Sequence, residues 1–377
     1  MRDVMAELES WWRNGASVGV GTVVATWKSA PRPPGAVMLV GPEGVAVGSV
    51  SGGCVEGDVY EVARAVRDSG EPVLRRYGVS DDDASAAGLT CGGVIDVFVE
   101  RVNRESFPQL AGVLRDIRAG RPVAVATLVS GVEGGHRAGR RLIVGAGSIQ
   151  GSLGSARLDA AVHDDVVGML AQGRSAIVRY GPDGERRSDD IAVFVAAYAR
   201  RPRMIVFGAI DFAAAVARIG SFLGYRVTVC DARPTFATAR RFPEVDEVVV
   251  QWPHRYLQHA YDHGEVDRRT VVCVLTHDPK FDVPLLELAL RMPLAYVGAM
   301  GSRRTNHDRL AKLRALGSTE EELARLHAPI GLDVGARTPE ETAVSIAAEI
   351  IALRWGGSGT QLRRIDGPIH REVDRKV

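Results

Sequence analysis

Two cysteines of the chain lie in glycine-rich turns, where a thiol can meet a ligand. Cys54 follows Ser51-Gly52-Gly53, and Cys91 precedes Gly92-Gly93. Glycines expose backbone N–H groups that can bind an anion, and a helix beginning beside Cys54 would stabilise its thiolate. A tight turn around a small buried cysteine would explain the first motif equally well. The two thiols could form a redox pair, ligate a soft metal or bind a sulfur-bearing cofactor.

The other two cysteines, Cys230 and Cys273, lie inside apolar stretches and are expected in the core. Neither Cys54 nor Cys91 has a second Cys or His at the spacing of zinc ligands. We therefore expect the protein to have no zinc site and no metal of its own.

A predicted strand over 204–207, a turn at Gly208, a helix and then Asp231 reproduce the layout of a dinucleotide-binding fold. Gly208 can make the tight turn. Ile210, however, stands where a glycine normally admits the pyrophosphate, and its branched side chain should crowd that group. The sequence predicts a Rossmann-type fold that does not bind NAD(P) at this turn in the ordinary way.

Further candidates follow later strands of the same predicted sheet. His277 and Asp278 follow one strand, and Gly301-Ser302-Arg303 follows the next. Ligands of open parallel sheets bind at the carboxyl ends of the strands, and the second loop is typical of a phosphate cradle with an arginine for bidentate contact. His277 alone would also fit a structural hydrogen bond. The Gly/Pro loop over 327–335 could close over this crevice.

The elements that must position these residues follow from apolar periodicity, which predicts an α/β fold of two domains, residues 1–199 and 200–377. No internal repeat is evident. In the first domain we expect helices near 4–12 and over 55–68, and strands over 18–26, 36–40, 94–99, 123–129, 142–144, 176–180 and 191–195. In the second we expect strands over 204–207, 226–230, 248–250, 271–276 and 294–297, a helix over 213–223 and a last helix over 338–355 with a capping box at Thr338 and Glu341.

Composition narrows the class of protein. The 377 residues are 46% hydrophobic and 25% charged, and 47 basic residues balance 46 acidic ones, so nothing favours nucleic acid or an anionic membrane. The charged N-terminus does not resemble a signal peptide, and no run reaches transmembrane length. Four cysteines are too few for a disulfide framework, which favours the cytoplasm.

Five segments in order resemble the motifs of the XdhC/CoxI family of xanthine dehydrogenase accessory proteins: SVSGGCVEGDV, GLTCGGVIDVFVE, LTHDPKFD, YVGAMGSRRT and HAPIGLDVGARTPEETAVSIAAEIIA. The resemblance covers about residues 48–355. It implies an N-terminal XdhC/CoxI domain and a C-terminal Rossmann-like domain. It also implies transient binding of a molybdopterin-type molybdenum cofactor, its protection during sulfuration and its delivery to a molybdenum hydroxylase such as xanthine or carbon monoxide dehydrogenase.

By this resemblance the chain is a maturation factor rather than an enzyme, and a name such as xanthine dehydrogenase would describe its partner. A cysteine desulfurase is a further candidate partner. The last helix is apolar on most sides, so it needs burial all round, either inside the Rossmann core or partly against a second subunit, and we expect a homodimer. The carried-over cofactor-binding residues are Gly52, Gly53, Cys54, Glu56, Cys91, Gly92, Gly93, Asp231, His277, Asp278, Gly301, Ser302, Arg303, His327 and Gly331.

As a mechanism, cofactor phosphate would lie on the glycine-rich N–H groups or near Arg303, while Cys54 or Cys91 contacts the metal–sulfur end. Which cysteine is primary stays open. The first Rossmann turn is less glycine-rich than is common in the family, which weakens any nucleotide site there. Two other classes compete with this interpretation: an NAD(P)-dependent oxidoreductase that uses the Rossmann crevice, and a non-enzymatic scaffold for the hydroxylase.

Overall fold

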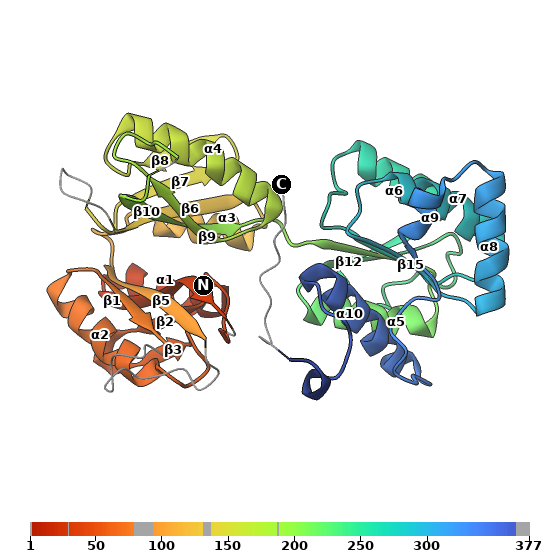
Figure 1. The fold of residues 1–377 in the computed structure, drawn as a ribbon, viewed down its shortest axis with the longest axis horizontal. Coiled ribbons are helices and arrows are strands. Elements are labelled where there is room, and N and C mark those ends of the chain that lie inside the picture. Colours follow the sequence, from red (N-terminus) through yellow and green to blue (C-terminus); the bar gives the residue numbers. More distant parts are fainter. Residues whose placement is uncertain (1, 29, 79–92, 131–136, 187, 367–377) are drawn as a thin grey trace. The chain divides into compact units, whose positions relative to one another are not determined.

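The computed structural model describes residues 2–28, 30–78, 93–130, 137–186 and 188–366 (Figure 1). These residues form two compact units that divide between Arg200 and Arg201. Both units combine helices with strands, so the predicted α/β class is confirmed. None of the described helices is long and apolar enough to cross a membrane.

The first unit consists of two structural repeats, which corrects the expectation that the chain has none. The strand orders of its two sheets are the same, β3-β2-β1-β5-β4 and β8-β7-β6-β10-β9. The first repeat contains β1 (Val18–Trp27), β2 (Val37–Val40), β3 (Ala46–Gly48), α2 (Glu56–Ser69), β4 (Val73–Tyr77) and β5 (Val94–Val102). The second contains β6 (Val123–Ser130), β7 (Arg141–Gly145), β8 (Ser148–Gly151), α4 (Ala156–Gln172), β9 (Ala176–Tyr180) and β10 (Ile191–Tyr198).

Corresponding residues of the two repeats make corresponding contacts. Gly48 and Gly151 both have a positive φ, and a Cβ on either would stand 2.3 Å from a carbonyl oxygen of the neighbouring strand. Tyr77 and Tyr180 each end a strand and donate a hydrogen bond to an aspartate on the helix of their own repeat. The two repeats resemble each other in strand order and at a few such positions, so the residue pattern along the chain does not reveal them.

Each sheet of the first unit is buried on both faces. α2 packs on the outer face of one sheet and α4 on the outer face of the other, so the two helices lie on opposite sides of the pair of sheets (Figure 1). The inner faces meet through residues such as Val24, Phe98 and Phe194. α1 (Met5–Arg13) and α3 (Leu110–Arg118) close one side of this interior with Leu8 and Leu114. Runs rich in β-branched valine suit strands that are buried in this way.

One ion pair joins the two sheets inside this interior. Arg141 of β7 places Nη2 2.5 Å from Oε2 of Glu100 on β5, and the two side chains are only 7% and 12% exposed. Arg141 also donates to the carbonyl oxygens of Ser106 and Gly139, and its guanidinium lies 4.3 Å from the centre of the Phe107 ring. Burial raises the pKa of Glu100 although Arg141 opposes the shift.

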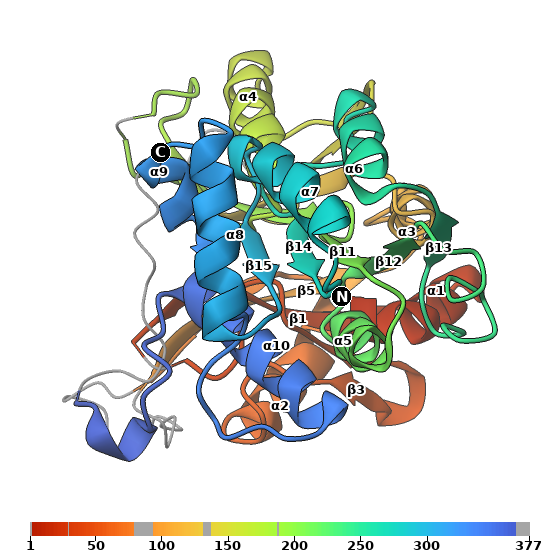
Figure 2. The ribbon, with the colours of Figure 1, turned by 90° about the vertical axis from the view of Figure 1, so that its right-hand side faces the viewer.

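The second unit is a parallel six-stranded sheet of order β13-β12-β11-β14-β15-β16, so the predicted Rossmann-like domain is confirmed. α5 and α10 cover one face, and α6 and α7 cover the other (Figure 2). Its strands are β11 (Arg203–Phe207), β12 (Arg226–Asp231), β13 (Glu247–Val250), β14 (Val271–Val274), β15 (Tyr296–Ala299) and β16 (Leu326–His327). Its α-helices are α5 (Asp211–Phe222), α6 (Pro253–Asp262), α7 (Pro279–Arg291), α8 (Arg303–Ala315), α9 (Glu320–Ala324) and α10 (Pro339–Trp355).

The start of α10 agrees with the sequence-based prediction, and the start of β15 differs from it. The capping box at Thr338 and Glu341 is confirmed, and it begins α10 with Pro339 in the first turn. The strand expected over 294–297 begins two residues later, at Tyr296. Pro293 has no N–H to donate, and the carbonyl of Leu294 accepts from Arg325 instead of pairing in the sheet.

Breaking the ion pair between the sheets should destabilise the first unit. Arg141→Met leaves the Glu100 carboxylate buried without its cation, and we expect a loss of about 3 kcal/mol in the free energy of unfolding, measured by urea denaturation. Arg121→Met is the matched control, because the pair of Arg121 with Asp116 is exposed to solvent and should contribute less than about 1 kcal/mol. Equal losses in the two variants would contradict this role.

Candidate functional site

The Gly52–Gly53 turn that precedes α2 is organised by the carboxylate of Glu56. Oε1 of Glu56 accepts hydrogen bonds from Ser49 Oγ at 2.7 Å and from the Ser51 and Gly52 N–H groups at 2.9 Å. Oε2 accepts from the Gly53 N–H at 2.8 Å. Burial alone would raise the pKa of Glu56, but these hydrogen bonds lower it to about 2. Glu56 is therefore ionised throughout the physiological range, and it serves the turn as an internal anion.

This arrangement changes what the glycines can do. The Gly52 and Gly53 N–H groups already donate to Glu56, so an external phosphate there would have to displace a carboxylate of the chain. Both glycines are exposed, have positive φ and have open space where a Cβ would stand. The turn thus presents bare backbone to solvent, and no described residue lies within 4 Å of where a Cβ would stand on either glycine.

Cys54 lies at the end of this turn, one residue before Val55, the N-cap of α2. Its side chain is partly exposed and packs in part against the core between α2 and the sheet. The positive end of a helix dipole favours an anionic ligand at this position. The other two described cysteines are buried, and burial raises the pKa of Cys273 to about 12 and also raises that of Cys230.

The second glycine-rich turn falls only partly within the described residues. Cys91 and Gly92 lie outside them, so the structure does not test their predicted role. Gly93 is described, and it is buried just before β5. The end of β4 beside it is tied to the first turn of α2, because Tyr77 Oη donates to Asp58 at 2.7 Å. Gly93 therefore enters the sheet at the same end as the Cys54 turn.

In the second unit the strand order reverses between β11 and β14, and ligands of such sheets bind outside the carboxyl ends of the strands at this point. The first turn, after β11, is packed tightly. Gly208 has φ +108°, and a Cβ on it would stand 3.0 Å from the backbone nitrogen of Thr276 in the loop after β14. Only glycine allows the two loops to approach so closely. Ile210 packs against the core beneath this turn.

Asp231, the acidic residue expected to face a ligand, is engaged within the protein. Its carboxylate accepts from the Ala209 N–H at 2.7 Å and from the Arg233 N–H, Nε and Nη2 at 2.8–3.0 Å. The side chain is 2% exposed. Burial would raise its pKa, but the hydrogen bonds from Arg233 and Ala209 hold the pKa below its usual value. To bind a ribose in the manner of an NAD site, Asp231 would have to release Arg233.

The loop after β14 presents His277 over a buried polar cluster. His277 is exposed, and Asp278 caps α7 by accepting from the Lys280 N–H at 3.0 Å. Behind them Asp282 accepts a hydrogen bond from Thr276. Burial raises the pKa of Asp282, although its hydrogen-bonding partners oppose the shift.

The same cluster connects this loop to the one after β15. Arg309 of α8 donates through Nη2 to Asp282 and to the carbonyl oxygen of Met300, both at 2.9 Å. Its Nη1 is buried and has no hydrogen-bond partner among the described residues. Ser302 caps α8 by accepting from the Thr305 N–H, and Arg303 is the exposed first residue of that helix. A buried donor without an acceptor under a helix N-terminus calls for a water molecule or an anion nearby.

His327 and Gly331 share an acidic partner that the sequence did not reveal. Glu349 of α10 accepts from Tyr296 Oη and from the Gly331 N–H at 2.9 Å, and His327 Nδ1 lies 3.6 Å from its Oε1. The rings of Tyr296 and His327 stack with centroids 4.9 Å apart. Burial would raise the pKa of Glu349, but His327, Tyr296 and Gly331 together lower it. The sequence feature that could have indicated this partner is Glu349 itself, a single carboxylate in an otherwise apolar stretch of helix.

The structure brings the later candidates together at one end of the second sheet. The loop that contains His277 and the loop that contains Ser302 meet through Arg309. The loop after β16 joins them, because Asn306 of α8 donates to the Ala328 carbonyl oxygen at 2.6 Å. The Cys54 turn belongs to the other unit. No cluster of His, Cys, Asp and Glu fit to hold a metal ion occurs in the described parts of either unit.

Comparison with protein families matches both units. Residues 204–350 match the family model described as the XdhC Rossmann domain. Residues 11–78 and 116–181 match the model of the XdhC and CoxI family. The segment 11–78 contains β1 to β4 of the first repeat, and the segment 116–181 contains β6 to β9 of the second. This family model therefore matches residues in both repeats.

Two relatives match over nearly the whole chain. A protein of Bacillus subtilis (strain 168) named as a probable xanthine dehydrogenase subunit is 29% identical over 339 residues, which are 89% of this chain and 92% of that protein. The molybdenum cofactor insertion chaperone PaoD of Escherichia coli (strain K12) is 26% identical over 341 residues, 90% of this chain and 85% of that protein.

Among solved structures, a protein from Bacillus halodurans described as a xanthine dehydrogenase matches with a TM-score of 0.67. The match covers 95% of this chain and 98% of that one at 24% sequence identity. At this identity the similarity shows a shared fold.

Replacing the internal anion of the first turn should change stability in a pH-dependent way. At pH 7, Glu56→Gln should lower the free energy of unfolding by about 1–2 kcal/mol, a value reduced for partial exposure to solvent. Because the pKa of Glu56 falls from 4.5 to about 2 on folding, its contribution is present above about pH 4.5 and is lost as the pH falls toward 2. Denaturant titrations between pH 7 and pH 3 should therefore show the two proteins converging.

Asp159→Asn in the second repeat is the matched control. Asp159 accepts hydrogen bonds from Ser152 Oγ and the Leu153 N–H, fewer than Glu56 accepts. Its replacement should have a smaller effect on stability. A difference for Glu56→Gln that does not change with pH would be incompatible with the internal-anion role.

Proposed function

Because the chain belongs to the XdhC and CoxI family, we propose that it binds molybdenum cofactor as cargo, assists its sulfuration and inserts it into a molybdenum hydroxylase. The partner would be of the xanthine or carbon monoxide dehydrogenase type, with a cysteine desulfurase as the source of sulfur. The name of the relative PaoD supports insertion of the cofactor. The observation that carries the proposal is the exposed Gly52-Gly53-Cys54 turn at the N-terminus of α2.

The two repeats provide an internal comparison for this turn. The second repeat keeps a serine and a carboxylate at the corresponding places, with Ser152 bonded to Asp159 as Ser49 is bonded to Glu56. In place of Gly52-Gly53-Cys54 it has Ser155-Ala156-Arg157. There Ser155 is the N-cap of α4 and Ala156 and Arg157 begin that helix, so the second repeat forms without two glycines and a cysteine at this position. Their presence in the first repeat supports a ligand-binding role for Cys54, while Glu56 positions the turn.

For the phosphate of the cofactor we propose the N-terminus of α8 in the second unit. Ser302 and Arg303 begin this helix, and the first N–H groups of a helix together with an exposed arginine suit a phosphate. The unpaired Nη1 of Arg309 beneath the turn supports a bound oxygen nearby. His277 lies in the loop after β14 and His327 ends β16, where they would contact other polar groups of the cargo. The chemistry of the cargo itself resides in its metal–sulfur centre.

The thiols give the direct test of this function. Cys54→Ala should lower the amount of pterin that copurifies with the protein from a host that makes the hydroxylase, and should leave the melting temperature unchanged. Cys91→Ala tests the second turn in the same way. Cys230→Ala and Cys273→Ala should instead lose about 1–2 kcal/mol of stability, because they empty buried volume.

Arg157→Ala is the matched control for Cys54→Ala, since Arg157 is exposed at the corresponding place in the second repeat. Its pterin content should equal that of the wild type. Pterin content that is the same in both loop cysteine variants as in the wild type would rule out the thiols as cofactor contacts.

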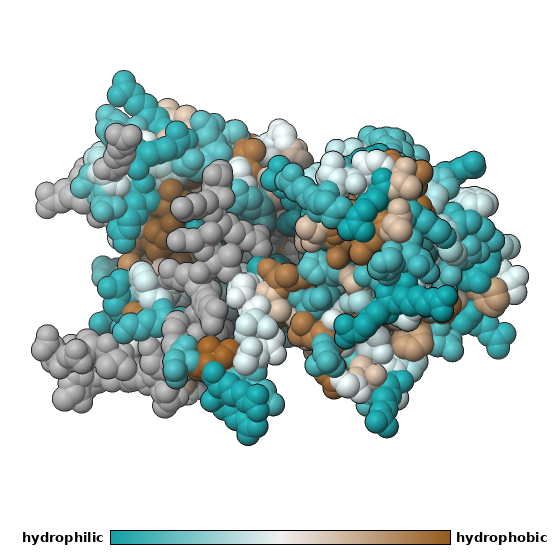
Figure 3. All heavy atoms as spheres, turned by 45° about the vertical axis from the view of Figure 1, so that its right-hand side comes forward, coloured by the Kyte–Doolittle hydropathy of each residue, from teal (hydrophilic) through white to brown (hydrophobic). Residues whose placement is uncertain are grey.

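We also propose a homodimer. On α10, Ala343, Ile346 and Ile350 are buried against the core that α5 completes, whereas Val344 and Trp355 on the other side are 56% and 55% exposed. Exposed hydrophobic residues of the molecule form brown patches in a mostly hydrophilic surface (Figure 3). Covering the exposed side of α10 with a second copy would remove apolar surface from water. Light scattering should give about twice the chain mass of 40.4 kDa, and a single-chain mass would refute the dimer.

A further inference from the structure

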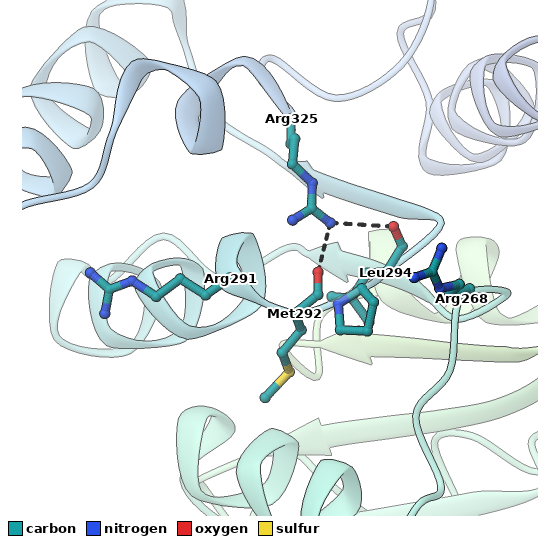
Figure 4. A pocket seen from close by; sticks show the side chains of 6 residues that line it. Arg268, Arg291, Met292, Leu294 and Arg325 are labelled. Carbon is teal, nitrogen blue, oxygen red and sulfur yellow. Dashed lines mark hydrogen bonds between the residues drawn. The ribbon is translucent and has the colours of Figure 1, made fainter.

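A cavity of about 450 Å³ opens at the amino ends of the strands of the second unit (Figure 4). It is lined by three arginines, Arg268, Arg291 and Arg325, and by the apolar segment 292–294. Arg268 lies in the loop before β14, Arg291 ends α7 before β15, and Arg325 directly precedes β16. The loops proposed to hold cofactor follow the carboxyl ends of the strands, so this cavity lies at the other end of the sheet.

The positive charge around the cavity is only partly neutralised. Arg268 is exposed and makes no hydrogen bond or ion pair within the described residues. Arg291 forms ion pairs with Glu287 at 3.0 Å and Glu322 at 3.6 Å, so its charge is balanced. No carboxylate belongs to the described lining of the cavity.

Arg325 is held in place without losing its charge. It donates to the carbonyl oxygens of Leu290 at 2.5 Å, Met292 at 2.7 Å and Leu294 at 3.4 Å, and Figure 4 shows its guanidinium reaching the last two. Carbonyl oxygens satisfy hydrogen bonds but do not neutralise a cation. The Leu290 and Met292 carbonyls belong to the C-terminal end of α7, which would otherwise repel an anion, and the Leu294 carbonyl lies just beyond that end. Arg325 therefore covers the partially negative end of α7 with a positively charged group that is held in place.

We propose that this cavity binds a compact polyvalent anion of the phosphate class. Its volume is in the range of small-molecule sites, and guanidinium groups match phosphate oxygens in geometry as well as charge. Arg268 supplies the unpaired cation and Arg325 the rigid one, and Met292, Pro293 and Leu294 form the wall beside them. The site is independent of the proposed cofactor function, because it shares no residue with the cofactor loops.

The test uses pyrophosphate as the probe and the whole chain as the sample. Phenylglyoxal modifies accessible arginines, and peptide mass spectrometry reports the extent at each position. Pyrophosphate should slow modification of Arg268 relative to sodium chloride at equal ionic strength, and should leave the exposed Arg255 on α6 unaffected. Protection of Arg268 should persist in Arg303→Gln, which separates this cavity from the N-terminus of α8.

Binding measured by calorimetry gives the second readout. Arg268→Gln should weaken pyrophosphate binding at this cavity by about tenfold, the effect of losing one charge-assisted hydrogen bond. Arg255→Gln makes the same change in net charge outside the cavity and should alter binding by less than about twofold. Arg268 modified at the same rate with and without pyrophosphate, or equal binding by the two variants, would overturn the proposal.

Discussion

Backbone N–H groups that are exposed by tight turns must find acceptors, and in this protein carboxylates of the chain itself supply them. Glu56 fills the turn before α2, Asp231 holds the first Rossmann turn, and Asp278 caps α7. Glu349 does the same for Gly331. Loops that would be typical anion sites in isolation are therefore occupied from within. A bound phosphate would use other groups, namely arginines and the N-terminus of α8, whose cap is a serine and not a carboxylate.

Comparison of the two repeats of the first unit distinguishes residues that both copies contain from residues that only one copy contains. A carboxylate and a serine recur in both copies, where Glu56 in one and Asp159 in the other accept a hydrogen bond from the serine that follows the third strand. The thiol occurs in one copy only. Equivalent sheets that pack face to face bury an interior in which an arginine and a glutamate are paired, and this burial makes the pairing between Arg141 and Glu100 necessary.

The parallel sheet of the second unit gives its two ends different chemistry. At the carboxyl ends, helix N-termini such as that of α8 and polar loops gather around Arg309, as expected for a fold of this type. At the amino ends the C-terminus of α7 would leave bare carbonyl oxygens, and Arg325 covers them. Groups that attract anions therefore lie at both ends of the sheet. At the carboxyl ends they are helix N-termini, and at the amino ends they are arginine side chains.

Features that depend on neighbouring residues could be predicted from the sequence. Apolar periodicity located most strands, residue spacing predicted the cap at Thr338, and the Rossmann-like order of elements followed from the region after residue 203. Glycine spacing also singled out the turn at Cys54. The pairing of distant groups became visible in the folded chain: Arg309 contacts Asp282, and Glu349 lies beside His327. Strand order sets these contacts, and so does the packing of helices on the sheet. Such pairings depend on the burial of whole faces, which no local pattern of residues records.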